Sequence, residues 1–580
     1  MMLSYANFLL NKPKTLISAV CIAGLFTAPI ALADDAKAAV KTKPKLVLQL
    51  TIDQLRGDLP FRYQDRFGEG GFNYLLNQGT VYRDAHHTHA NTETIVGHAS
   101  LATGANPSNH GLIGNMWYDR KAGETVYNIE DANYKLLSAN ADVDKSTEID
   151  PTQKAASVDG RSPMNIQSST FSDEMVISSN GKAKVFGVSV KDRGAVSLAG
   201  HGGKAFWFSK ANSEFITSNY YYEEYPQWVN NWNKKKLPEQ FSNKSWELMN
   251  DKSTYLFGKD DDKAWELKLG GYGRVFPHAF GDKSSKYFST FLTVSPVGDE
   301  ITVDFAKALI INENIGKDNI TDYLSISLSS TDYIGHFFGS SSLESEDNML
   351  RLDKTLADLF TYIDKHVGLE NTVIVLSADH GGPEAPGYLN EHKINGDYVT
   401  AKQWDELDVV SKVKAELDIK EQLISNYSHP YIYLDHEVIK KHNISIAEVQ
   451  NRVAKALSTM DDVHLTVASN RLETGDFPDT LLYRAILNNY SPKRSGDIYM
   501  VYPPHDFIND LEGLVVAATH GSPWTYDTFV PIIFAGKGIP AQQIYRKVEA
   551  IDIAPTLSAL LNIKAPSANE GLILEEVFTK

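Results

Sequence analysis

Five short apolar runs that end in polar, chemically reactive residues constrain the fold more than any other feature of this chain. Each run is too short for a typical helix and is rich in Val, Ile and Leu, as in strands buried between two helix layers. Helical patterns lie between them, for example at 349–367. Strands that alternate with helices predict a three-layer α/β/α sandwich with a mostly parallel central sheet. The runs are 45–53, 184–190, 322–332, 371–381 and 513–521.

The residues at the ends of these runs predict one site at one edge of the sheet. In open α/β sheets, ligands bind at the carboxyl ends of the strands. A single strand that ends in Asp is more often followed by a simple loop cap, but five such endings are hard to explain as caps. The residues are Asp53, Lys191 with Arg193, Asp332, Asp379 with His380, and His520.

Three aspartates and three histidines of this region have the composition of a metal site. Asp332 and His336 stand four residues apart, so both lie on one face if the chain turns helical after the strand. Carboxylates and imidazoles without thiolates suit Zn²⁺ best, with Mn²⁺ or Fe possible. Six ligands are too many for one zinc ion but fit two metals bridged by a substrate oxygen. The predicted ligands are Asp53, Asp332, His336, Asp379, His380 and His520.

The order of the motifs resembles the alkaline phosphatase superfamily, in the branch of threonine-nucleophile alkaline phosphatases of the phosphate-irrepressible type and nucleotide pyrophosphatase/phosphodiesterases. The resemblance implies a zinc-dependent hydrolase that releases phosphate from broad organic monoesters through a phosphothreonine at Thr94. It also implies one Zn²⁺ held by Asp53, Thr94, Asp379 and His380, and another held by Asp332, His336 and His520. The motifs are "TIDQLRGD", "TETIVGHASLATG", "HGLIGNMWYDR", "VSVKDRGAVSLAGH", "SSTDYIGHFFG", "LSADHGG" and "ATHGSPW".

The physical setting of Thr94 agrees with the nucleophile that the resemblance implies. A hydroxyl at the start of a helix lies at the positive end of the helix dipole, and a coordinated metal would stabilise its alkoxide further. The N–H of Ile95 is then expected to point at phosphoryl oxygens. We expect the competing hydroxyl of Thr92 to cap the helix and Glu93 to face solvent or cap the first turn.

Lys191 and Arg193 favour a monoester over a diester as the substrate. In an extended segment the two cations point to the same side, with Asp192 turned away, and together they suit a dianionic phosphoryl group. In isolation this could equally be a solvated charged turn, but the resemblance places a K-x-R at this position in monoesterases. It also implies that Asn115 donates to a phosphoryl oxygen.

Other functions remain open at this point. The main alternative is a phosphodiesterase or nucleotide pyrophosphatase on the same two-metal site. A non-catalytic zinc or phosphate carrier would explain the ligands without a nucleophile. A sulfatase would need a C-x-P-x-R signature, which the chain lacks, and a related phosphoglycerate mutase would be cytosolic and use serine.

The first residues predict export from the cell. Lys12 and Lys14 precede an apolar run that ends in Ala31-Leu32-Ala33, the layout of a signal peptide over residues 1–33. The mature chain would have no cysteine and no membrane anchor, so we expect a periplasmic or secreted protein, acting as a monomer. The net charge of −17 argues against nucleic acid as a partner.

The mature chain is expected to be one catalytic unit with two insertions. Residues 34–43 predict a flexible N-terminus, and 44–580 an alkaline-phosphatase-like domain. Residues 201–300 show no clear alternation of strand and helix, which indicates an inserted cap. Residues 428–500 have the pattern of a small α+β subdomain.

Overall fold

The computed structural model describes residues 43–146, 148–400, 402–508 and 516–578. The expected signal peptide and all but the last residue of the expected flexible N-terminus lie outside the described residues. Among the helices described, none combines the length and the apolar character that crossing a membrane requires.

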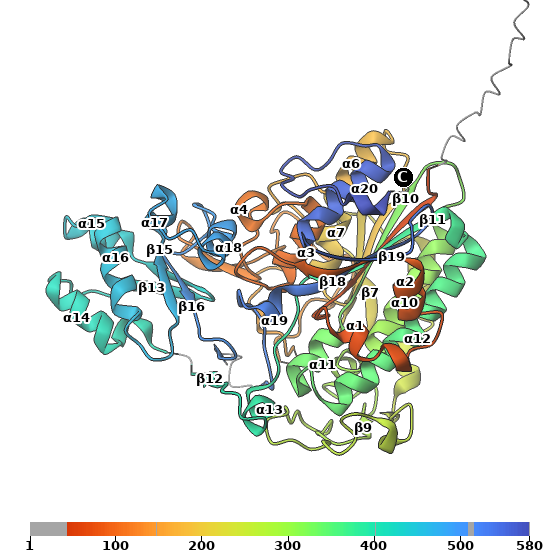
Figure 1. Ribbon diagram of the computed structural model, residues 1–580, viewed down its shortest axis with the longest axis horizontal. Coiled ribbons are helices and arrows are strands. Elements are labelled where there is room, and N and C mark those ends of the chain that lie inside the picture. Colours follow the sequence, from red (N-terminus) through yellow and green to blue (C-terminus); the bar gives the residue numbers. More distant parts are fainter. Residues whose placement is uncertain (1–42, 147, 401, 509–515, 579–580) are drawn as a thin grey trace, which may run out of the picture. The chain divides into compact units, whose positions relative to one another are not determined.

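A nine-stranded sheet forms the centre of the described chain (Figure 1). Its strand order is β19-β2-β18-β11-β1-β10-β5-β6-β7, and five of its eight pairings are parallel. The predicted α/β class with a mostly parallel sheet is therefore confirmed. The strands are β1 (Leu46–Ile52), β2 (Thr80–His86), β5 (Val185–Ser189), β6 (Lys204–Ser209), β7 (Glu214–Ile216), β10 (Asp322–Leu328), β11 (Thr372–Ser377), β18 (Phe529–Gly536) and β19 (Gln542–Glu549).

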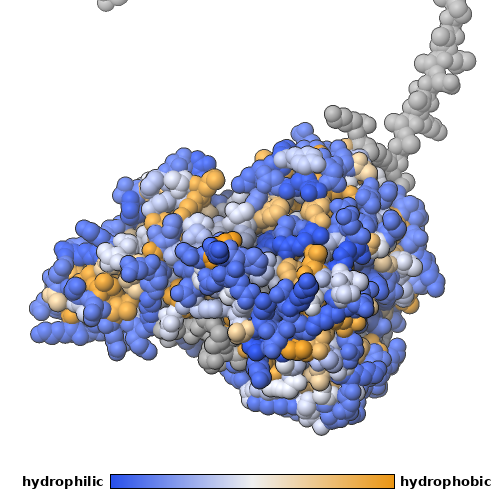
Figure 2. Space-filling model, turned by 60° about the horizontal axis from the view of Figure 1, so that its bottom comes forward, coloured by the Kyte–Doolittle hydropathy of each residue, from blue (hydrophilic) through white to orange (hydrophobic). Residues whose placement is uncertain are grey.

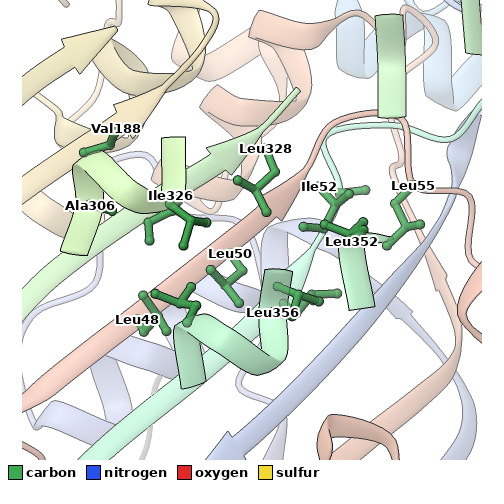
Figure 3. Close-up of a cluster of buried hydrophobic side chains, with 14 of the residues drawn as sticks. Leu48, Leu50, Ile52, Leu55, Val188, Ala306, Ile326, Leu328, Leu352 and Leu356 are labelled. Carbon is green, nitrogen blue, oxygen red and sulfur yellow. The ribbon is translucent and has the colours of Figure 1, made fainter. Parts of the chain in front are cut away.

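Helices cover the sheet because its central strands are buried on both faces. All seven residues of β1 are buried. Figure 3 shows Leu48, Leu50 and Ile52 of this strand packed with Leu352 and Leu356 of α12. On the other face, α7 packs on β5 and β6 and against α3. The covering helices include α2 (Phe72–Gln78), α10 (Val297–Asn312) and α12 (Leu343–His366) on the first face, and α3 (Thr94–Thr103), α6 (Phe171–Ser178), α7 (Asp192–Ala199) and α20 (Ile553–Leu561) on the second (Figure 1).

The expected strand at 513–521 is wrong for the part that the structure describes. Residues 516–521 form an irregular segment, and residues 513–515 lie outside the described part of the chain. The main chain of this segment bonds to a helix rather than to a strand, because the N–H of Ala517 donates to the carbonyl of His336 at 2.8 Å. The next strand along the chain, β18, joins the central sheet between β2 and β11.

The region 201–300 contributes to the central sheet as well as to its surroundings. Its first part supplies β6 and β7, which end the sheet on one side. Its remainder contains α8 (Gln227–Lys234) and a two-stranded pair, β8 (Ser245–Trp246) with β9 (His278–Ala279).

A second sheet occupies the region 428–500, which was expected to form a small α+β subdomain, and begins slightly before it, at Ile424. Its strand order is β13-β14-β16-β15, and it has its own buried apolar cluster with α16 (Ile446–Leu457). The strands are β13 (Ile424–Ser428), β14 (Tyr431–Leu434), β15 (Leu465–Ala468) and β16 (Ile498–Val501). Figure 2 shows that the surface of the molecule is largely hydrophilic on the face it presents, with apolar residues in small patches.

Candidate active site

The predicted ligands meet at the carboxyl end of the central strands. Asp53 follows β1 directly, and its N–H donates to the carbonyl of Leu328 at the end of β10 at 2.9 Å. Asp379 lies two residues beyond β11. Asp332 lies in the first turn of α11 (Ser330–Phe338), so that the expected i, i+4 relation with His336 is realised on a helix.

Asp53, Asp379 and His380 form a first group of candidate metal ligands. One ligand atom from each lies within 4.8 Å of the others, and all three side chains are buried. The Nε2 of His380 is 3.5 Å from Asp53 Oδ1 and 3.4 Å from Asp379 Oδ2. Its Nδ1 donates to the carbonyl of Gly381 at 2.8 Å, which leaves the Nε2 lone pair directed at the carboxylates.

Asp332, His336 and His520 form a second group built in the same way. Each imidazole Nε2 is 3.3 Å from Asp332 Oδ1. The Nδ1 of His336 donates to Ala518 and that of His520 to Thr92, both to main-chain carbonyls. The two groups adjoin, because the rings of His380 and His520 stack with centroids 3.6 Å apart.

Buried polar atoms in these groups fit the binding of cations. Asp53 Oδ1 and His380 Nε2 are buried and have no hydrogen-bond partner among the described residues. Burial, with Asp332 and Asp379 nearby, raises the pKa of Asp53 well above its usual value. Burial lowers the pKa of His380, which keeps the imidazole neutral and able to ligate. Two adjacent groups of carboxylate and imidazole, without thiolates, have the ligand types that bind divalent metal ions such as zinc.

Thr94 is the first residue of α3, as expected for a hydroxyl at a helix start. Its Oγ1 accepts from the Nη2 of Arg193 at 3.4 Å. The helix lies against the first ligand group, because the Nδ1 of His98, one turn later, is 3.1 Å from Asp379 Oδ2.

The residues around Thr94 differ from the expectation. Thr92 does not cap the helix, because its hydroxyl donates to the carbonyl of Ser522 at 2.8 Å. Glu93 is the N-cap residue of α3 and is partly exposed, but its side chain makes no capping bond. Its Oε2 accepts the N–H of Asn115 at 2.5 Å, and burial raises its pKa to about 7. The N–H of Ile95 donates to Asn115 Oδ1 at 3.1 Å and so does not point at a phosphoryl group.

The two predicted cations approach the site from the start of a helix. Lys191 is the N-cap of α7 and Arg193 lies in its first turn, so the expected extended segment is wrong beyond Lys191. Asp192 does turn away, accepting from the hydroxyl of Tyr127 at 2.6 Å and from Arg161 at 2.8 Å. Lys191 Nζ lies 2.7 Å from Asp53 Oδ2 and 2.5 Å from Asp332 Oδ2, between the two ligand groups.

A cavity of about 470 Å³ opens from this cluster. Its lining includes polar and charged side chains, among them Thr94, Asn115, Arg193 and His520. It also includes aromatic side chains, among them Tyr427, Tyr499, Tyr502 and Phe507. A dianion would meet the guanidinium and the amide of this lining, and an organic group would pack on the aromatic rings.

The structure adds polar residues that the sequence did not reveal. Asp150 lies 2.9 Å from Arg193 Nη1, and the guanidinium lowers the pKa of this buried carboxyl although burial opposes it. Gln54 and His98 contact ligand carboxylates. Asp150 precedes Pro151 and caps a short helix, α5 (Pro151–Lys154), a local signal that was visible in the sequence but said nothing about Arg193.

The chain is similar to known proteins over most of its length. The sequence model of the family described as type I phosphodiesterase / nucleotide pyrophosphatase matches residues 47–523. Alkaline phosphatase PafA of Elizabethkingia meningoseptica is 33% identical over 572 residues, which cover 98% of this chain and 100% of the relative. The crystal structure of wild-type PafA superimposes with a TM-score of 0.83, covering 93% of this chain and 99% of that one.

Two further relatives cover most of the chain. Alkaline phosphatase PhoV of Synechococcus elongatus is 33% identical over 538 residues, which cover 92% of this chain and 93% of the relative. A protein of Myroides odoratus named calcium-transporting ATPase is 32% identical over 571 residues, which cover 98% of this chain and 99% of the relative.

Proposed function

The chain belongs to the type I phosphodiesterase/nucleotide pyrophosphatase family, and from this we propose that it is an alkaline phosphatase that hydrolyses phosphate monoesters with two zinc ions and Thr94 as the nucleophile. One observation supports monoesters most strongly. Arg193 lines the cavity beside Thr94, with its Nη2 3.4 Å from the Thr94 Oγ1. Lys191 Nζ lies 2.7 Å from Asp53 and 2.5 Å from Asp332, one carboxylate in each ligand group. A monoester carries one more anionic oxygen than a diester, and two buried cations suit that oxygen.

Each of the two ligand groups would hold one ion. Asp53, Asp379 and His380, with the Thr94 oxygen, would hold one zinc ion; Asp332, His336 and His520 would hold the other. Bound zinc would stabilise the alkoxide of Thr94 and neutralise the charge on the leaving oxygen.

In the first step the Oγ1 of Thr94 attacks phosphorus in line with the leaving oxygen. The new O–P bond forms as the bond to the leaving alcohol breaks, which gives a phosphothreonine and the free alcohol. The Arg193 guanidinium and Lys191 ammonium stabilise the phosphoryl oxygens. The Oδ1 of Asn115 is taken up by the N–H of Ile95, so its amide nitrogen remains to donate to the phosphoryl group.

In the second step water attacks the same phosphorus and the Thr94 oxygen leaves. Inorganic phosphate is released and the hydroxyl is restored. The cavity beyond the cations is large compared with a phosphoryl group, which supports leaving groups of varied size.

A phosphodiesterase activity is the second candidate, and the description of the matching family favours it. The same nucleophile and ions would serve, with an organic group where the third anionic oxygen of a monoester lies. For the setting, we propose a monomer that acts in the periplasm or outside the cell. The support for export is the sequence pattern over residues 1–33.

Hydrolysis of an aryl phosphate monoester and its diester by the purified mature protein tests this function. We expect the monoester to be hydrolysed with the higher kcat/KM, activity to be lost on chelation, and zinc to restore it. Thr94→Ala should remove nearly all turnover while circular dichroism remains that of the wild type. A zinc-loaded protein that hydrolyses neither ester, or a fully active Thr94→Ala variant, contradicts the proposal.

A further inference from the structure

Gln54 has a backbone conformation that needs an explanation. It follows Asp53 directly and has φ of 65°, in the left-handed region that side chains other than glycine rarely adopt. Its side chain is buried, with 5% of its surface exposed. Backbone strain of this kind persists only where surrounding contacts hold it, and it is common at functional sites.

The contacts of Gln54 reach one carboxylate in each ligand group. Its main-chain N–H donates to Asp379 Oδ1 at 3.2 Å. Its side-chain Nε2 donates to Asp332 Oδ1 at 3.1 Å. Asp379 Oδ1 also accepts the N–H of His380 at 3.1 Å, so two N–H groups hold this oxygen and the other oxygen, Oδ2, faces the first ligand group.

The Gln54 side chain occupies space that is open only because two neighbouring residues are glycines. A Cβ atom at Gly335, on α11 between Asp332 and His336, would lie 1.8 Å from Gln54 Oε1. A Cβ atom at Gly382 would lie 2.8 Å from Gln54 Cγ. The carboxamide is thus enclosed by segments from both ligand groups. It supplies a donor to a ligand carboxylate without adding charge to the site.

We propose that Gln54 is a positioning residue that orients the ligand carboxylates of both groups and thereby controls how firmly each ion is held. The inference rests on the proposed two-zinc site. Hydrogen bonds to ligating groups fix their orientation, and their loss typically weakens metal affinity about 10–100-fold. The backbone of Gln54 acts on Asp379, whereas its side chain acts on Asp332.

Two substitutions separate these roles. Gln54→Gly keeps the left-handed backbone, because glycine adopts it without strain, but removes the side chain. Gln54→Val opposes the left-handed backbone as well, because a branched Cβ is disfavoured there. We measure zinc content and the rate at which zinc passes from the loaded protein to a chromogenic chelator. Gln54→Gly should release one of its two ions about 10–100-fold faster than the wild type and the other at the wild-type rate; Gln54→Val should release both faster.

Gly335→Ala gives an independent variant with the same prediction. The added methyl clashes with the Gln54 side chain, so it should speed the release of the same single ion as Gln54→Gly. In a Gln54→Gly background the clash is absent, and adding Gly335→Ala should change the release rate by less than about 2-fold. Asn562→Val is the matched control, since it places the same branched side chain at a left-handed position, φ 50°, at the end of α20. It should leave both release rates unchanged.

The inference is overturned if Gln54→Gly and the wild type release both ions at equal rates, or if Gln54→Gly speeds both equally. Thermal unfolding of each variant distinguishes lost metal from lost fold. A wild-type protein that binds two zinc ions but hydrolyses no monoester refutes the proposed function and leaves this inference standing. A wild type that binds fewer than two refutes both.

Discussion

Lys191 and Arg193 are two residues apart and fully buried, yet they have different partners. Lys191 lies between Asp53 and Asp332, and these carboxylates raise its pKa although burial opposes the charge. Arg193 is held by Asp150 and reaches the Thr94 hydroxyl. Lys191 therefore lies at the ligand carboxylates, and Arg193 is the cation that is fixed beside Thr94, the proposed nucleophile.

This difference predicts that Arg193 discriminates between monoesters and diesters. Arg193→Ala should lower kcat/KM for an aryl phosphate monoester by about 100-fold or more, the usual effect of losing a donor to transition-state charge. The loss for the matching diester should be less than about 10-fold, since a diester lacks the extra anionic oxygen. Asp150→Asn keeps the guanidinium but loosens it, so it should show the same pattern with smaller losses. Equal losses on both esters would refute the discrimination.

At the scale of elements, the close approach of α3 to its neighbours depends on a glycine. Gly97 lies one turn after Thr94, and a Cβ atom there would be 1.8 Å from the carbonyl oxygen of Asp379. The helix that carries Thr94, the proposed nucleophile, therefore packs directly on the main chain of Asp379, a member of the first ligand group. This contact fixes the distance between Thr94 and the first ligand group.

Gly97→Ala should consequently harm both stability and activity. Helix propensity alone predicts a gain of about 1 kcal/mol for this substitution. The clash should reverse the sign and lower the free energy of unfolding by about 1–3 kcal/mol. Activity should fall further than stability, because α3 must move away from Asp379. Gly270→Ala, where no atom lies within 4 Å of the added Cβ, is the control. A stabilised and fully active Gly97→Ala variant would show that α3 is not placed by this contact.

The elements that could be predicted from sequence are those whose own residues determine them. The buried strands β1, β5, β10 and β11 are continuous apolar runs, and the residues that end them do converge. The segment before His520 has the same composition but is irregular where described, because it bonds to α11 instead of a strand. The amino-acid composition of the segment could not reveal whether it pairs with a strand or with α11, since that pairing depends on a partner distant in sequence.

Local rules failed most clearly around Thr92 and Glu93. Their positions before a helix predict capping, yet their oxygens are engaged by Ser522 and Asn115. The same limit applies to Gln54, whose φ cannot be inferred from its neighbours in the sequence. Candidate ligands could be proposed from the sequence because they are recognised by residue type, whereas the hydrogen bonds that orient these side chains depend on tertiary contacts.

At the scale of the whole molecule, the second sheet is bonded to the loop that carries His520. The Nε2 of His429 is 3.1 Å from the carbonyl oxygen of Gly521, and its Nδ1 is 3.1 Å from the Tyr427 hydroxyl. On the other side, His520 donates to the carbonyl of Thr92. The second ligand group is thus connected to α11, to the segment before Thr94 and to the second sheet. Binding of an ion to this group should therefore stabilise the contacts between these parts.

Removal of metal should therefore destabilise the molecule and not only inactivate it. Without ions, the site buries the carboxyl groups of Asp53, Asp332 and Asp379 around Lys191, and burial together with the neighbouring carboxylates raises the pKa of Asp53 well above its usual value. At each site, zinc at about 1,000 times its dissociation constant adds about 4 kcal/mol to the free energy of unfolding. We expect chelation to lower the thermal midpoint and to speed hydrogen exchange at residues 516–523 more than in β1. Zinc should restore both, whereas Mg²⁺ should not, because it prefers octahedral oxygen sites to imidazole ligands. A chelated protein with the melting curve and exchange pattern of the zinc-loaded one would show that these buried groups do not depend on a metal for their stability.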